Sequence, residues 1–137
     1  MSDNDAVPRT RREALLIMGA GLLGALARPL DASRSNTAHP EPRPGVTAAA
    51  VLDPASVPEG ARAGYEAARA IPEVLDGLYC YCDCAERDGL RSLLSCFETR
   101  MPVQCSICVG EARMAHRLAR QGRTLTEIRK SIDDRYK

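Results

Sequence analysis

The hydrophobic residues in the second half of the chain recur every three or four positions, which is the spacing of amphipathic helices. Short apolar stripes predict helices that begin at Ala61, at Pro72 and at Gly89. A longer stripe predicts a helix over residues 105–121, and the capping-box sequence of residues 124–127 opens a last one. The strict alternation that is typical of a β-strand is missing from the pattern.

The first half of the chain begins with a different pattern. An uncharged apolar run over residues 14–27 follows the pair Arg11-Arg12. The run is shorter than the roughly 20 residues that a membrane span needs. Basic residues, a short apolar run and a small-residue ending are typical of an export signal, and the arginine pair indicates the twin-arginine type. We therefore expect residues 1–27 to be a twin-arginine-type export signal, with an uncleaved anchor as the alternative.

Residues 28–60 carry many prolines and small residues and have no sustained apolar period. This composition predicts a Pro/Ala-rich, disordered linker, in which His39 would be a solvated bystander. The predicted fold class is all-α: a small cysteine-rich bundle of short helices over residues 61–137, after the N-terminal signal and the linker. A domain of that size often needs a metal ion or disulfides, because it buries little apolar surface.

Composition narrows the functional classes. The formal net charge is +1, so nucleic acid is not an expected partner. The chain has no tryptophan and one phenylalanine, which excludes a large aromatic core. All six cysteines lie between positions 80 and 108. One small region is therefore held together, or put to use, by sulfur.

The spacing of the cysteines suggests how they act together. Cys80, Cys82 and Cys84 alternate, so in an extended segment their side chains point to one face. Cys105 and Cys108 are three residues apart, which places both on one face of a helix. Two such groups from separate segments are the usual ingredients of a thiolate metal site, and equally of a disulfide framework. The candidate metal ligands are Cys80, Cys82, Cys84, Cys96, Cys105 and Cys108.

Soft thiolate ligands select Cu(I), Zn(II) or an iron–sulfur cluster. Three thiols within five residues suit Cu(I), four thiolates suit a structural zinc ion, and an iron–sulfur cluster is the less expected cofactor. Cys82, Cys84, Cys105 and Cys108 would form a tetrahedral set, with the other two cysteines as extra ligands or a flanking disulfide. His116 is a weak candidate for an outer ligand and is more readily explained as a surface residue.

Two alternatives remain open. A disulfide-stapled helical interaction module would use the same six cysteines without a metal. A dithiol redox enzyme would use Cys105-Ser-Ile-Cys108, but such motifs usually accompany a βαβ pattern, which is missing here. We predict a protein that is not an enzyme and binds a soft metal as carrier, store or sensor. It would be periplasmic or extracellular, or membrane-tethered if the signal is not cleaved, and its partner would be another exported metal-handling protein.

Residues of about 71–137 carry a family resemblance. The segments concerned are Ile71–Leu75, the cysteine loop Tyr79–Cys84, Leu93–Phe97, Cys105–Cys108, and Glu127–Arg129 with Ile132-Asp133. Together they resemble the PCYCGC-motif proteins, small exported bacterial proteins of unassigned function. Tyr79 stands where the motif has proline, and Asp83 where it has glycine. The resemblance implies export and a cysteine-based site, and it supplies no activity.

Overall fold

The computed structural model describes residues 39–137, and within that range its regular elements are all helices. The predicted all-α class is therefore confirmed. The α-helices are α1 (Glu59–Ala70), α2 (Pro72–Asp76), α3 (Cys84–Asp88), α4 (Leu93–Phe97), α5 (Ser106–Arg120) and α6 (Leu125–Tyr136). Three short 3₁₀ helices complete the set: η1 (Ala48–Ala50), η2 (Pro54–Ser56) and η3 (Met101–Gln104).

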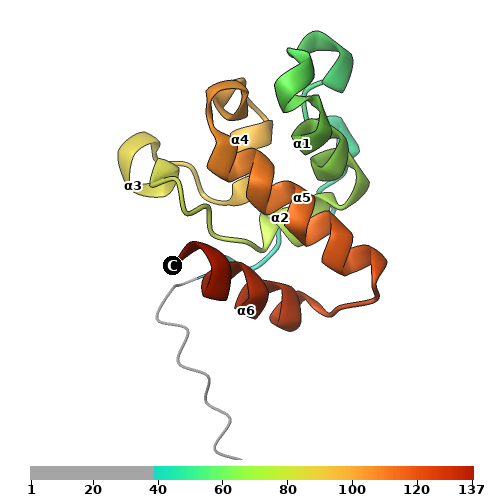
Figure 1. Cartoon of the computed structure of the whole chain (residues 1–137), viewed down its shortest axis with the longest axis vertical. Coiled ribbons are helices and arrows are strands. Elements are labelled where there is room, and N and C mark those ends of the chain that lie inside the picture. Colours follow the sequence, from blue (N-terminus) through green and yellow to red (C-terminus); the bar gives the residue numbers. More distant parts are fainter. Residues whose placement is uncertain (1–38) are drawn as a thin grey trace, which may run out of the picture. The chain divides into compact units, whose positions relative to one another are not determined.

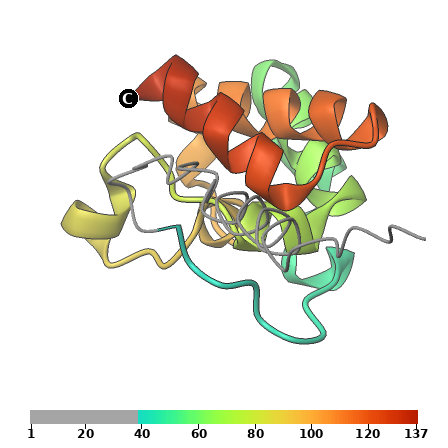
Figure 2. The same ribbon diagram turned by 90° about the horizontal axis from the view of Figure 1, so that it is seen from below.

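Helix α5 is the centre of the arrangement. It packs along α1 on one side and against α6 on the other, while the short helices α2 and α4 contact each other (Figure 1). Helix α3 stands at the periphery in both views (Figures 1 and 2). The cysteine loop joins α2 to α3, so its two ends are fixed by helices.

The ends of the helices follow from local chemistry. In α6 the predicted capping box is present: Thr124 Oγ1 accepts a hydrogen bond from the Glu127 N–H at 3.3 Å, and Glu127 accepts one from the Thr124 N–H at 2.8 Å. The helix predicted from Gly89 is wrong in its first part, because Gly89 has a left-handed φ of 68° and ends α3. Helix α4 starts only at Leu93, after the N-cap Ser92.

The core is small and largely aliphatic, in line with the composition. Tyr65 and Phe97 pack edge to face, with ring centroids 5.0 Å apart. Gly64 lets α1 approach α5 closely, because a Cβ at this position would lie 3.1 Å from both Phe97 and Val109. Four of the residues buried in this core are cysteines: Cys80, Cys84, Cys96 and Cys108.

The part of the predicted linker that the structure describes, residues 39–60, is not a free linker. Residues 39–60 pack against the helices, with Val51 and Val57 only 3% and 4% exposed. The Leu52 N–H donates to the Phe97 carbonyl at 3.1 Å. Proline-rich sequence was misleading here because side-chain and backbone contacts, rather than an apolar period, hold the segment. Residues 28–38 of the predicted linker and the predicted signal over residues 1–27 lie outside the described residues.

Asp76 anchors this N-terminal segment. Its fully buried carboxylate accepts hydrogen bonds from the Arg43 backbone N–H at 2.6 Å and from the Arg43 guanidinium at 2.8 Å. Arg91 and Ser92 each donate to it at 2.9 Å. Burial alone would raise the pKa of Asp76, but the Arg43 hydrogen bonds outweigh it and lower the pKa to about 2. Among residues 39–137, no helix combines the length and apolarity needed to cross a membrane.

A substitution pair tests the α1–α5 contact. We expect Gly64→Ala to lower the free energy of unfolding by about 1–3 kcal/mol, because the added methyl meets Phe97 and the Val109 backbone. Gly60→Ala in the same helix is the control: nothing lies within 4 Å of its Cβ, so better helix propensity should leave stability equal or higher. Denaturant unfolding under reducing conditions measures both. Equal effects of the two substitutions would contradict the close contact.

A second pair tests the buried carboxylate. Because its pKa is lower in the folded state than the ordinary 3.8, Asp76 stabilises the fold above that pH, and this contribution is lost as the pH falls toward 2. We expect Asp76→Asn to destabilise the protein at pH 7 by about 2–4 kcal/mol and to flatten the acid dependence of unfolding. Asp134→Asn, which removes an exposed pair with Lys130, should change stability by less than about 1 kcal/mol.

Candidate metal centre

The cysteine loop turns sharply at Asp83. This residue has a left-handed φ of 62°, the one non-glycine residue with positive φ in the described part of the chain. The turn lets Cys84 begin α3 while its side chain still faces the side of Cys82. The extended triplet predicted from the alternation is therefore bent. Aspartate tolerates this conformation better than most residues, and the glycine of the family motif adopts it freely.

Cys108, in the first turn of α5, is the hub of the sulfur cluster. Its Sγ lies 3.5 Å from that of Cys80, 3.4 Å from that of Cys82 and 3.1 Å from that of Cys105. The sulfurs of Cys80 and Cys82 are 3.3 Å apart. The prediction that the two cysteine segments meet is confirmed: the sulfurs of Cys80 and Cys82, from the loop, contact the sulfur of Cys108, which also contacts that of Cys105.

The remaining cysteines join the same cluster. The sulfurs of Cys84 and Cys96 lie with those of Cys80, Cys82 and Cys108 in a group whose members are all within 4.8 Å of one another. Cys105 lies outside this mutual group but contacts Cys108, and as N-cap of α5 its sulfur accepts a hydrogen bond from the Cys108 N–H at 3.4 Å. All six predicted ligand residues are thus brought together.

Cys82 and Cys84 are bonded as a disulfide within this group. The other four cysteines are free thiols: Cys80, Cys96, Cys105 and Cys108. The pair is separated by one residue only, so the bond closes a small ring in the loop and joins no two helices. The same two sulfur atoms can therefore be bonded to each other or, once reduced, serve as ligands.

The spacing of the sulfurs fits a metal ion. A tetrahedral site with Zn–S bonds of about 2.3 Å separates its sulfur atoms by about 3.8 Å. The contacts of Cys108, at 3.1–3.5 Å, are slightly shorter. An ion among them would need the side chains to move outward by a few tenths of an ångström. The donor set, dominated by thiols, is the one that soft ions prefer.

Glu111 is a buried carboxylate at the cluster that the sequence analysis missed. One turn after Cys108, its side chain is fully buried and accepts a hydrogen bond from the Cys80 thiol at 3.2 Å and from the Tyr81 N–H at 3.0 Å. Burial raises the pKa of Glu111 to about 7, against the opposing effect of these two bonds. A charged residue three positions after a cysteine on the buried helix face was the signal that could have revealed it.

The pKa values of the buried thiols of Cys80, Cys96 and Cys108 are raised, so these thiols are protonated. Hydrogen bonding with the Cys108 thiol raises the pKa of Cys80 well above its ordinary value, and burial and the nearby Glu111 raise it further. A bound cation acts in the opposite direction, because it stabilises thiolates directly. Metal binding to the cluster would therefore release the protons of these thiols.

A polar network holds the loop in place from outside. Asp133 of α6 accepts hydrogen bonds from the Tyr81 hydroxyl at 2.6 Å and from His39 Nε2 at 2.8 Å. His39 Nδ1 accepts one from the Tyr79 N–H at 3.0 Å. The prediction that His39 is a solvated bystander is wrong, because its ring is 6% exposed and positions the backbone next to Cys80.

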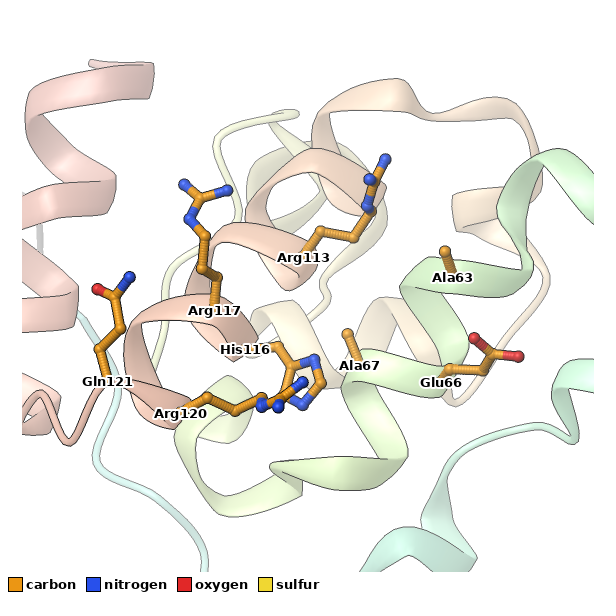
Figure 3. A pocket seen from close by; sticks show the side chains of 8 residues that line it. All are labelled: Ala63, Glu66, Ala67, Arg113, His116, Arg117, Arg120 and Gln121. Atoms are coloured by element: carbon orange, nitrogen blue, oxygen red, sulfur yellow. The ribbon is translucent and has the colours of Figure 1, made fainter.

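His116 does not contribute to the cluster. It lines a surface hollow between α1 and α5, together with Arg113, Arg117, Arg120 and Glu66 (Figure 3). This is the outward face of α5, since Cys108, Ala112 and Ala115 face the interior. The position of His116 fits a surface residue better than an outer metal ligand.

Comparison with known proteins adds a family. A family model described as a protein of unknown function with PCYCGC motif matches residues 52–137. The match spans the cysteine loop, the α5 cysteines and the closing helix. No curated protein and no solved structure matches the chain.

Proposed function

The chain belongs to the family of proteins of unknown function with the PCYCGC motif, and on that premise we propose that it binds a soft metal ion through its clustered thiolates. The ion is Cu(I) or Zn(II), and the protein acts as carrier, store or sensor rather than as an enzyme. The ligands are the six cysteines that meet beside α5: Cys80, Cys82, Cys84, Cys96, Cys105 and Cys108.

One observation carries this proposal. The sulfur of Cys108 is in contact with three other cysteine sulfurs that come from both sides of a long sequence gap. If these positions only had to fill the apolar core, aliphatic side chains would serve as well as cysteines, because they pack equally closely and do not oxidise. Three buried thiols, with the partly exposed thiol of Cys105 beside them, are therefore better explained as ligands than as packing residues.

The disulfide between Cys82 and Cys84 favours a second candidate, a stapled helical interaction module without metal. Disulfides stabilise mainly by closing long loops, typically by about 2–4 kcal/mol. A ring that spans a single intervening residue contributes less, and it cross-links no separate segments. The metal-binding function explains the four remaining thiols, which the stapled module leaves without a bond. The mass of the exported protein separates the two, since full pairing of six cysteines removes six hydrogens.

Export of a protein with reduced thiols is consistent with this role. A twin-arginine signal would carry the chain out already folded, with metal loaded in the reducing cytoplasm, where thiols persist. Outside the cytoplasm, the bound ion would protect the thiolates from oxidation. The natural partner is then another exported metal-handling protein that receives the ion or supplies it.

Cys108→Ser tests the cluster at its hub. We expect the anaerobically reduced full chain to bind a soft metal stoichiometrically, and the variant to bind it at least tenfold more weakly, because it loses the sulfur that contacts three others. Ser106→Ala, on the exposed side of the same turn, is the control. Elemental analysis and competition with a chelator give the affinities, and circular dichroism checks folding. Six titratable thiols and no bound metal in the native protein would contradict the function.

The export proposal has its own test. We expect the full chain to be recovered outside the cytoplasm, and the double variant Arg11→Lys/Arg12→Lys to stay in the cytoplasm, because the twin-arginine route reads the arginine pair. Arg9→Lys is the control: it makes the same arginine-to-lysine replacement two positions before the pair, so this variant should be exported normally. Cell fractionation and immunoblotting measure the distribution. Equal export of all three proteins would exclude the twin-arginine route.

A further inference from the structure

The cluster contains more sulfur than one metal ion can use. A structural zinc ion takes four ligands, whereas six cysteine sulfurs meet here. The contact network is also continuous: Cys105 contacts Cys108, which contacts Cys80 and Cys82. A single-ion site would use four of these sulfurs and leave two, such as Cys82 and Cys84, whose sulfurs are bonded to each other in this structure.

A seventh sulfur extends the cluster. Met101, in η3, has its Sδ 3.4 Å from the Cys84 Sγ. Thioethers are ligands for Cu(I) but not ordinary ligands for zinc, which takes thiolate, imidazole and carboxylate. The position of Met101 therefore distinguishes the two metals that the thiols alone do not.

Exposure divides the sulfurs into two groups. Cys80, Cys84, Cys96 and Cys108 are at most 2% exposed. Met101, Cys82 and Cys105 are partly exposed and line one surface hollow, into which Cys84 also faces. The cluster thus opens to the surface on one side only, and the thioether lies at that opening.

Resting on the proposed metal-binding function, we propose that the site holds several Cu(I) ions bridged by shared thiolates, with Met101 as an additional ligand at the surface opening. If each of the six thiolates bridges two ions, the cluster provides roughly twelve metal–sulfur bonds, enough for about four three-coordinate Cu(I) ions. Sulfur atoms in mutual contact are what bridging requires, since neighbouring ions share them.

Copper enters and stays in the cluster as Cu(I), so the binding of copper needs no oxidant or reductant for the metal. A thiol reductant first reduces the Cys82–Cys84 disulfide by exchange and is itself oxidised to a disulfide. Each cysteine thiol then releases its proton to solvent as Cu–S bonds form and the bonds between Cu(I) and its donor break. Ions arriving at the hollow meet Met101 and Cys105 before the buried thiols.

Anaerobic titration of the reduced full chain with Cu(I), against a chromophoric Cu(I) chelator, tests the stoichiometry. We expect about four equivalents to bind, with the emission that is characteristic of Cu(I)–thiolate clusters growing as they do. Binding that stops at one equivalent of Cu(I) would overturn the inference and leave the proposed function standing. Failure of both Cu(I) and Zn(II) to bind would instead contradict the proposed function, and this inference with it.

Met101→Leu tests the thioether, because leucine keeps the apolar volume and removes the sulfur. We expect the variant to lose Cu(I) to the chelator several-fold faster than the native chain, while its Zn(II) affinity is unchanged. Met114→Leu is the matched control, since Met114 is a half-buried methionine that lines a different hollow on α5. Equal Cu(I) release from the two variants, or an equal loss of Zn(II) affinity in Met101→Leu, would overturn the role of Met101.

Discussion

Contact between sulfur atoms from separate stretches of the chain is the constraint on which the structure depends. Cys108 is fixed by the first turn of α5, and Cys80 by a loop that follows α2, so their meeting defines how these elements pack. The core around them has one phenylalanine and no tryptophan. A domain with so little aromatic surface needs another source of cohesion, and a metal ion held by the cysteine cluster would supply it when bound.

The sequence predicted this meeting but not what surrounds it. Cysteine spacing was sufficient because periodicity determines which side chains share a face. Met101 and Glu111 were missed since neither belongs to the cysteine pattern: one is placed by the turn of η3, the other by tertiary burial of a residue type that is usually exposed. The bend at Asp83 was also beyond the pattern, because alternation describes only an extended chain.

The helices show the same division. The capping box of α6 and the proline that starts α2 were readable because they act through neighbouring backbone atoms. The segment of residues 39–60 was not, because long-range contacts hold it, such as the hydrogen bond of Leu52 to Phe97. A proline-rich composition indicates that a segment does not form a regular helix or strand, but it does not indicate which distant residues the segment contacts.

Arg43 has a consequence for where the folding unit begins. The family model starts at residue 52, yet the guanidinium that neutralises Asp76 comes from nine residues earlier, and His39 precedes it. A recombinant fragment trimmed to the matched residues would keep the buried carboxylate and discard one of its two arginine partners, which lowers the free energy of unfolding. The family match and the contacts that stabilise the fold therefore begin at different positions among the described residues.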